Sequence, residues 1–138
     1  MGHEHFSFTP IGYVSHEHGE VPRHCSVSDY EGKIIINPEY NEGLRDIKTG
    51  DIIVVLFCFH KSPSFTSERL IAKPPHLVEE RGVFSTCSPV RPNPIGLSYV
   101  EVMDIDNNVI YVRRLDMLDG TPVLDIKPYI PYAPLEQK

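Results

Sequence analysis

Apolar positions along the chain form short β-branched runs or recur at every second residue, and neither pattern lasts long enough for a long helix. The run KIII at 33–36 stands between Gly32 and Pro38, and the run IIVVLFCF at 52–59 follows Gly50. Short apolar runs bounded by turn residues, like alternation with a period of two, predict β-strands. The second run is apolar on both faces, so we expect it inside a sheet rather than at an edge.

A further extended segment is expected near the start, at 6–14. The clearest hairpin joins 98–103 to 109–112, because the sequence Asp-Asn-Asn at 106–108 suits a tight turn. This hairpin is the strongest local prediction of tertiary structure in the chain.

Helix signals are confined to single turns at 38–44 and 67–71, and 13 prolines leave no room for a long helix. The pattern therefore predicts an all-β fold, a single-domain, β-barrel-like rolled sheet that spans the chain. Long proline-rich loops, longer than a compact domain usually spends on connections, are expected at 15–31, 60–81 and 86–97.

Length and composition agree with one globular domain. The chain has 138 residues, of which 41% are hydrophobic and 23% charged, enough to bury one core but not two. No run approaches the roughly 20 apolar residues of a membrane span, and the start MGHEHFSF lacks the basic and apolar regions of a signal peptide. Three cysteines form neither an even disulfide set nor a paired zinc pattern. We therefore expect a cytoplasmic protein with free thiols and no membrane partner.

The net charge of −6 weighs against nucleic-acid binding, because contacts to phosphates need a positive field. A local cluster of cations would still supply such a field. The candidates for that cluster are Arg23, Lys61, Arg69, Lys73, Arg81, Arg91, Arg113, Arg114 and Lys127.

The first unusual segment is GVFSTCSPVRPNPIG at 82–96, which we expect to begin as a strand and continue as a loop stiffened by three prolines. Each proline fixes φ and removes a hydrogen-bond donor. Arg91 and Asn93, which lie between prolines, would then meet a ligand with little conformational entropy left to lose. The same residues also suit a structural turn with a solvated arginine, and both interpretations stay open.

The second unusual segment is LDMLDGTPVLDIKPYIP at 115–131, where polar and apolar residues alternate. In an extended chain Asp125, Lys127 and Tyr129 point to one face. These side chains could polarise a substrate, or they could form an ion pair beside a packed tyrosine. The spacing alone favours the ion pair.

These two segments, in this order and at this separation, resemble the two signature segments of the TrmO (TsaA-like) family. Shorter matches support the resemblance: VPR at 21–23, PEYNEGL at 38–44 and LFCFHKS at 56–62. It covers roughly residues 8–132. It implies a β-barrel-like fold, usually a homodimer, that binds S-adenosylmethionine near the subunit interface. It also implies methylation of the exocyclic nitrogen of N6-threonylcarbamoyladenosine beside the tRNA anticodon.

The resemblance also implies a set of site residues. Carried over by motif, the cofactor-binding residues are Pro22, Arg23, His24, Lys61, Ser62, Cys87, Ser88, Tyr99, Leu115, Asp116, Met117 and Leu118. The expected contacts to the RNA substrate are Arg91, Asn93, Lys127 and Tyr129. The acceptor nitrogen is urea-like and a poor nucleophile, so a general base has value, and the candidates are His60 and Asp125. Phe84, Tyr129 or Tyr132 would stack on the flipped base.

Two positions depart from the family pattern. Members commonly read ATRS where this chain reads STCS at 85–88, so Cys87 replaces an arginine and removes a cation beside the expected cofactor site. Members also often read PRQ, whereas here His24 follows Pro22-Arg23.

Two other functions compete with this one. The acidic net charge and Cys87 favour a non-catalytic module that binds S-adenosylmethionine or a nucleotide, whereas the intact RPNPIG and DGTPVLDIKPY segments favour an enzyme. A methyltransferase with a different acceptor is the other alternative.

A metal site is not expected. The histidines at 3, 5, 16, 18 and 24 supply suitable ligands, but their spacing fits no closed zinc site. The strand aromatics Phe57, Phe59, Tyr99 and Tyr111 are expected to lie in the core rather than to stack on bases.

Overall fold

The computed structural model describes residues 4–74 and 77–135. Its strands are β1 (Gly12–Ser15), β2 (Glu31–Ile36), β3 (Ile52–Cys58), β4 (Ile71–Ala72), β5 (Arg81–Gly82), β6 (Ile95–Asp106), β7 (Val109–Arg113) and β8 (Pro122–Pro128). Its 3₁₀ helices are η1 (Cys25–Val27), η2 (Pro38–Leu44), η3 (Ser67–Leu70) and η4 (Val83–Ser85). No helix within these residues has the length and apolarity to cross a membrane.

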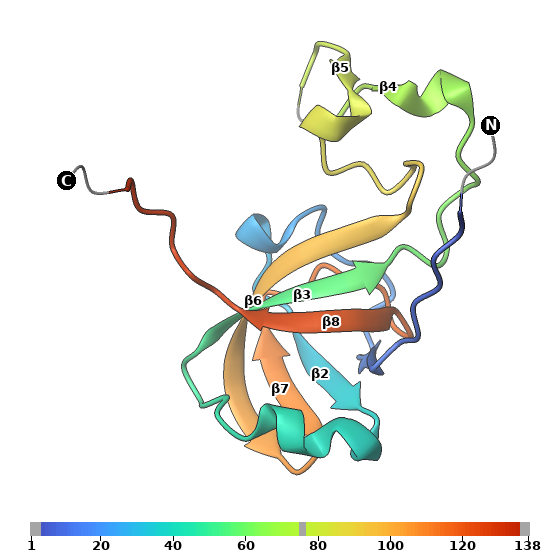
Figure 1. Cartoon of the computed structure of the whole chain (residues 1–138). Coiled ribbons are helices and arrows are strands. Elements are labelled where there is room, and N and C mark those ends of the chain that lie inside the picture. The colour runs from blue at the N-terminus through green and yellow to red at the C-terminus, as the bar shows by residue number, and fades with distance from the viewer. Residues whose placement is uncertain (1–3, 75–76, 136–138) are drawn as a thin grey trace.

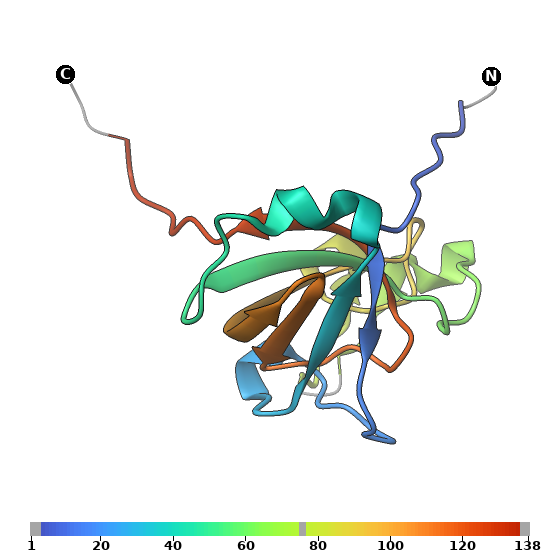
Figure 2. The same cartoon turned by 90° about the horizontal axis from the view of Figure 1, so that it is seen from below.

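One antiparallel sheet closes on itself in the order β1-β2-β7-β6-β3-β8 (Figure 1). Strand β3 lies between β6 and β8, as its uninterrupted apolar sequence predicts. The ring closes where β1 meets β8, over the two pairs Gly12↔Val123 and Tyr13↔Pro122. Figure 2 shows the strands arranged around a common interior. The predicted all-β, barrel-like sheet is confirmed.

The core lies inside this ring and is built from alternate strand residues. In β3, for example, Ile53, Val55 and Phe57 are buried while the residues between them face outward. β-Branched side chains suit such half-buried, pleated positions. The buried residues of the core are Val14, Ile34, Ile36, Leu44, Ile53, Val55, Phe57, Val100, Val102, Ile110, Val112, Leu115, Met117 and Val123.

The predicted hairpin is present and is longer than its periodic residues suggest. Strand β6 continues to Asp106 and β7 begins at Val109. Asn107 connects them with φ of 53°, in the left-handed region that asparagine tolerates better than most residues. The side chain of Asn108 also donates to the Ile36 carbonyl oxygen, at 2.7 Å, which ties the turn to β2.

A long excursion separates β3 from β6 although the two strands pair directly, Cys58 opposite Ile95. We call residues 60–94, apart from 75–76, the loop lobe. It carries η3, η4 and the small β4–β5 ladder, and it projects above the ends of β3 and β6 in Figure 1. A hydrogen bond from the Phe59 N–H to the Pro94 carbonyl oxygen, at 2.8 Å, closes its base.

Three sequence expectations differ from the structure. The segment 6–14 is a strand only from Gly12 onward. The strand expected from residue 82 ends at Gly82, because the Thr86 N–H and Oγ1 both donate to the Val83 carbonyl oxygen and make a 3₁₀ turn. Tyr99, at 41% exposed, and the half-buried Tyr111 lie outside the core, because the alternation of β6 turns its even-numbered residues inward and that of β7 turns Ile110 and Val112 inward.

Candidate functional site

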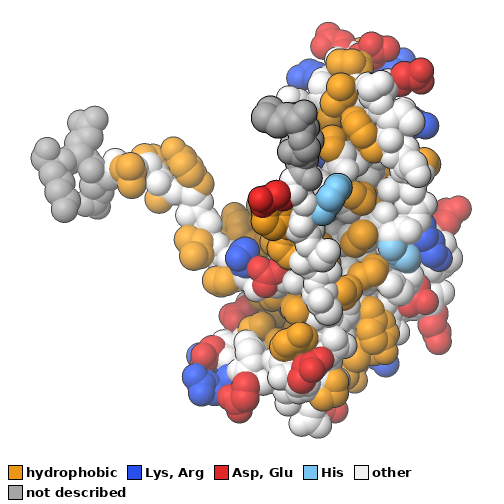
Figure 3. All heavy atoms as spheres, turned by 45° about the vertical axis from the view of Figure 1, so that its right-hand side comes forward, with side chains coloured by type: hydrophobic (Ala, Val, Ile, Leu, Met, Phe, Trp, Pro, Cys, Tyr) orange, Lys and Arg blue, Asp and Glu red, His pale blue; other side chains and the backbone are white. Residues whose placement is uncertain are grey.

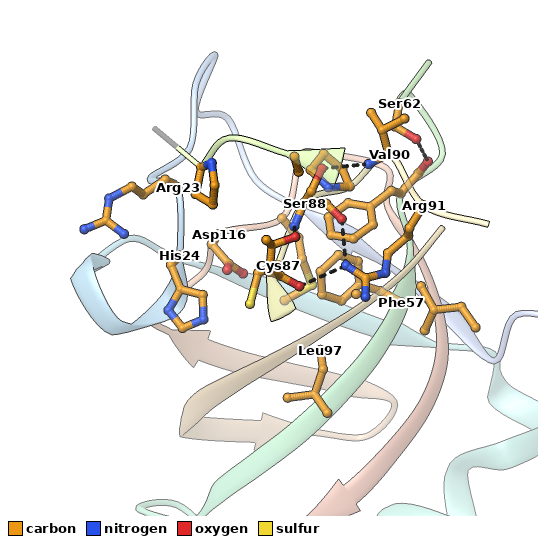
Figure 4. A pocket seen from close by; sticks show the side chains of 18 of the residues that line it. Arg23, His24, Phe57, Ser62, Cys87, Ser88, Val90, Arg91, Leu97 and Asp116 are labelled. Atoms are coloured by element: carbon orange, nitrogen blue, oxygen red, sulfur yellow. Dashed lines mark hydrogen bonds between the residues drawn. The ribbon is translucent and has the colours of Figure 1, made fainter. Parts of the chain in front are cut away.

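A pocket of about 1480 Å³ opens between the barrel and the loop lobe (Figure 4). Five segments line it: the loop 21–24, the end of β3 with 59–63, the lobe residues from 69 to 91, the start of β6, and 116–118 with Thr121. Both unusual segments of the sequence contribute to it. The closed sheet therefore brings together stretches that lie up to a hundred residues apart.

The pocket floor is apolar because of the way β6 and β3 pack. Ile95, Leu97 and Tyr99 point outward from β6 toward the pocket, each more than 40% exposed. Between them, Gly96 leaves room for the buried Phe57 ring, since a Cβ on Gly96 would lie 2.2 Å from that ring. The floor is thus rigid and suited to a flat apolar group.

The proline-stiffened loop is held by its own hydrogen bonds. The Arg91 guanidinium donates from Nη1 to the carbonyl oxygens of Thr86 and Ser88, at 3.0 and 3.1 Å. The Ser88 N–H donates to Thr86 Oγ1 at 3.2 Å, and the Val90 N–H donates to Ser88 Oγ at 3.3 Å. Arg91 therefore has a structural role here that its place between prolines left open.

Asp116 is the only acidic side chain among the described residues that line the pocket. The hydroxyl of the fully buried Ser98 donates to its Oδ1 at 2.6 Å. Burial raises the pKa of the Asp116 carboxyl above its ordinary value. The hydrogen bond from Ser98 and the nearby charge of His24 act in the opposite direction on that pKa but do not cancel the effect of burial.

His24 and Cys25 stand beside this carboxyl. The His24 ring is fixed through Nδ1, which accepts from the Ser26 N–H at 3.1 Å and lies 2.8 Å from Ser26 Oγ. Cys25 is buried, and its sulfur accepts the Tyr99 N–H at 3.4 Å. Burial is the largest cause that raises the pKa of the Cys25 thiol, and the charge of Asp116 raises this pKa further. The hydrogen bond from the Tyr99 N–H acts in the opposite direction. Cys87 of the lobe is exposed.

The pocket is locally basic although the chain is acidic. Its lining holds five cationic side chains against the single carboxylate: Arg23, Lys61, Arg69, Lys73 and Arg91. Figure 3 shows hydrophobic side chains along the face from lobe to barrel, with acidic and basic side chains mixed at the lobe's far end. Five of the nine candidate cations thus line the same pocket.

A second, smaller hollow of about 770 Å³ lies between η2 and the end of β8. Asp125, Lys127 and Tyr129 line it, and Lys127 Nζ lies 3.1 Å from Asp125 Oδ2, the ion pair that the spacing favours. The Tyr129 ring makes an edge contact with the Tyr99 ring, at 5.0 Å between centroids. Tyr99 belongs to the large pocket, so the two hollows adjoin there.

The structure therefore divides the residues predicted for the site. Those in the large pocket are Pro22, Arg23, His24, His60, Lys61, Ser62, Cys87, Ser88, Arg91, Tyr99, Asp116, Met117 and Leu118. Asp125, Lys127 and Tyr129 line the smaller hollow instead. Asn93 is exposed and lines neither, and Leu115 is fully buried in the core.

Sequence reasoning missed Ser98 as part of the site, and it named Arg69 and Lys73 only as candidates for a cation cluster. A signal for Ser98 was available, because it is the polar residue on the inward side of the alternating strand 95–102. Arg69 and Lys73 carry no such signal, since nothing local shows that η3 and β4 fold back over the pocket.

No group of three or more histidine, cysteine or acidic side chains suited to a metal ion occurs within 4–74 and 77–135. His3, part of the histidine-rich start, lies outside the described residues.

Comparison with known proteins gives a consistent result. Residues 13–134 match the family model described as the tRNA-methyltransferase O N-terminal domain. An S-adenosyl-L-methionine-binding protein of Archaeoglobus fulgidus is 44% identical over 125 residues, 88% of each chain. The Escherichia coli tRNA (adenine(37)-N6)-methyltransferase is 36% identical over 140 residues, 93% of this chain and 59% of the enzyme. The crystal structure of TrmO from Pseudomonas aeruginosa superposes with a TM-score of 0.72 at 32% identity, covering 94% of this chain and 58% of that one.

Proposed function

This chain belongs to the TrmO family through its match to the tRNA-methyltransferase O N-terminal domain, and we propose that it transfers a methyl group from S-adenosylmethionine to an adenosine of tRNA. We propose further that the acceptor is the exocyclic nitrogen of N6-threonylcarbamoyladenosine beside the anticodon. The observation that carries the proposal is a single basic pocket with an apolar floor, lined by residues of both signature segments.

The relatives named as tRNA methyltransferases are longer than this chain. The chain spans 59% of the Escherichia coli enzyme, whereas the relative that it matches over 88% of both lengths is named only as a binding protein for S-adenosylmethionine. Binding of the cofactor and transfer to RNA must therefore be tested separately.

The pocket residues fit a cofactor that combines a purine, a positive centre and a carboxylate. Leu97, Tyr99 and Leu118 offer an apolar surface for the purine. Arg23 and Lys61 supply positive charges for the carboxylate. Because these two cations remain, Cys87 at the usual arginine position leaves the pocket basic.

When bound, S-adenosylmethionine would supply a methyl group on a sulfonium, open to in-line displacement. The chain's own contribution would then be alignment and exclusion of water. The hydrogen bonds from Arg91 to carbonyl oxygens of its own loop hold one wall of the pocket in place before a ligand arrives. The packing of Phe57 against Gly96 does the same for the pocket floor. His60, exposed at the pocket edge, remains a candidate proton acceptor.

The cations on the lobe side of the pocket suit an RNA backbone. Arg69 and Lys73 are both exposed, so their charges can reach phosphates. Phe84 is 75% exposed, and its ring is available to stack on a base that leaves the anticodon loop. Asp125, expected as a second candidate base, is ion-paired to Lys127 in the smaller hollow, which disfavours that role.

We also propose that the protein is a homodimer. The outer face of β3 and β6 is apolar over adjacent pairs, with Leu56 opposite Leu97 and Val54 opposite Tyr99. Ile52 at 46% and Leu97 at 46% are exposed there. Patches of this kind in soluble proteins mark interaction surfaces, and a partner on this one would cover part of the pocket floor.

The dimer is tested by analytical sedimentation. The natural chain should sediment as a dimer and the Ile52→Glu variant as a monomer. A natural chain that sediments as a monomer would contradict the proposal.

The first experiment is calorimetric titration with S-adenosylmethionine and S-adenosylhomocysteine, followed by transfer of labelled methyl to tRNA with and without the threonylcarbamoyl group. Binding together with transfer only to the modified tRNA is the expected result. Binding without transfer to any RNA would favour the non-catalytic module. Transfer to unmodified tRNA alone would mean a different acceptor.

The role of the lobe cations is tested by the salt dependence of tRNA binding. Arg69→Ala and Lys73→Ala should each lower the slope of log K against log salt by about 0.7, the value per phosphate contact of a single strand. Lys48→Ala, an exposed cation outside the pocket lining, is the matched control and should leave the slope unchanged. Equal slopes for all the variants would place the RNA elsewhere.

A further inference from the structure

Asp116 is the carboxyl group best placed to act on a proton in the large pocket. It lines the pocket, whereas Asp125 lines the smaller hollow and is held 3.1 Å from the Lys127 ammonium. No other acidic side chain is found among the described lining residues. Among described carboxylates, position alone thus singles out Asp116.

The carboxyl group of Asp116 is held in one orientation. Ser98 is fully buried and donates to Oδ1 at 2.6 Å, which leaves the serine hydroxyl no freedom to turn to solvent. Leu115, the preceding residue, is fixed in the core through its N–H to the Tyr30 carbonyl oxygen and through its own carbonyl oxygen to the Ser28 hydroxyl. Groups that move protons need such fixed geometry.

The surroundings of Asp116 also suit a proton acceptor. Burial raises the pKa of its carboxyl, which brings a carboxylate closer to the range useful for accepting a proton near neutral pH. The titratable groups around it are His24, before η1, and the thiol of Cys25 in η1. Figure 4 shows Cys87 of the lobe near the same carboxyl group.

We propose that Asp116, positioned by Ser98, accepts the proton that the acceptor nitrogen loses during methyl transfer; this rests on the proposed function. The nitrogen's electron pair forms the new bond to the methyl carbon as the carbon–sulfur bond breaks and its pair returns to sulfur. The N–H proton passes to the carboxylate, so the charges of sulfonium and carboxylate are both removed. Ser98 acts as a positioning residue through Asp116.

The test compares Asp116→Asn, Ser98→Ala and, as matched control, Asp125→Asn in the full chain. Single-turnover transfer to tRNA and calorimetric binding of S-adenosylhomocysteine are measured across pH for each. Asp116→Asn should lower the transfer rate by about 10² to 10⁴-fold, the usual contribution of general acid–base catalysis, with binding of S-adenosylhomocysteine retained. Asp125→Asn should keep the natural rate.

Ser98→Ala gives a result that a merely structural role would not. Its hydrogen bond favours the carboxylate form, so its loss should move the midpoint of the pH–rate profile to higher pH while the plateau is largely kept. Carbon-13 NMR of labelled aspartate carboxyls should show the same shift in the titration of Asp116, independently of turnover.

Two outcomes would overturn the proposal while the proposed function stands: an Asp116→Asn protein that transfers at the natural rate, or one that loses binding of S-adenosylhomocysteine and transfer together. The second would make Asp116 a ligand-binding group. If the natural chain itself transfers no methyl group to any tRNA, the proposed function fails, and this proposal fails with it.

Discussion

Burial of Asp116 makes its ionisation costly to the folded state. A carboxyl whose pKa is raised on folding binds its proton more tightly in the folded than in the unfolded chain. Its favourable contribution is present below the unfolded pKa and is lost as pH rises through the folded pKa. We therefore expect Asp116→Asn to raise the free energy of unfolding at pH 7 relative to the natural chain, with the difference shrinking toward acidic pH. Urea unfolding at several pH values measures this, and an equal or lower stability of the variant at pH 7 would contradict it.

The cysteines should differ sharply in reactivity. Cys87 is exposed at the pocket, whereas Cys25 is 3% exposed and burial raises the pKa of its thiol, so little thiolate forms at neutral pH. Mass spectrometry after brief alkylation should find Cys87 labelled and Cys25 unlabelled until the protein is unfolded. S-Adenosylhomocysteine, if it fills the pocket, should protect Cys87. Equal labelling of both thiols would mean that the η1 segment opens in the folded protein.

At the residue scale, most of the site residues predicted from the sequence do line the large pocket, but the sequence did not show how they work. Arg91 looks like a ligand contact because prolines flank it, yet its guanidinium bonds two carbonyl oxygens of its own loop. Asp125, Lys127 and Tyr129 do share a neighbourhood, but in the smaller hollow. Side-chain periodicity specifies a face of a strand, and only the closed sheet decides which hollow that face meets.

Among the elements, β6 needs a glycine where it packs against β3. Gly96→Ala would place a Cβ 2.2 Å from the Phe57 ring, which is 3% exposed. Forcing this contact should lower the free energy of unfolding by about 1–3 kcal/mol and weaken binding in the pocket. Thermal and urea unfolding measure the loss. Gly19→Ala, where nothing lies within 4 Å of the added Cβ, is the control and should cost little.

The elements that the sequence predicts well are those decided by local alternation or turn chemistry. Strands β2, β3, β6 and β7 and the Asn107 turn fall in this class. The segment 82–86 does not: its apolar Val83 and Phe84 suggest a strand, but Thr86 hydrogen-bonds back to Val83 and closes a turn. The pattern of apolar and polar residues does not predict a hydrogen bond between a side-chain hydroxyl and a backbone carbonyl oxygen, so it did not predict this turn.

At the scale of the molecule, the weakest point of the ring is its closure between β1 and β8. Two residue pairs join these strands and one contains Pro122, which has no N–H, whereas β3 and β6 share seven pairs. The amides of Ile11, Val14 and Gly120, which bridge the closure, should therefore exchange with deuterium sooner than those of the β3–β6 ladder. Native-state hydrogen exchange tests this, and uniform rates would mean that the barrel opens as one unit.

The large pocket is the feature that sequence patterns could not predict. It exists because a lobe inserted between two directly paired strands folds back over the sheet, and because 21–24 and 116–118 arrive from distant parts of the chain. Loop sequences specify stiffness through proline, but the direction in which a loop leans is set by contacts far away in sequence. Resemblance to a family supplied what periodicity did not.

The position of β3 between β6 and β8 has a consequence for how the protein is made. Strand β3 leaves the ribosome early, but its second partner, β8, ends near residue 128. The roughly 60 residues between them take about 3–13 s to synthesise at 5–20 residues per second. During that interval the nascent chain presents an apolar strand with an unpaired edge, the kind of surface that chaperones bind and that aggregates when crowded. The complete closed sheet has no edge strand, but the protein must pass through an incomplete state in which β3 is an edge strand.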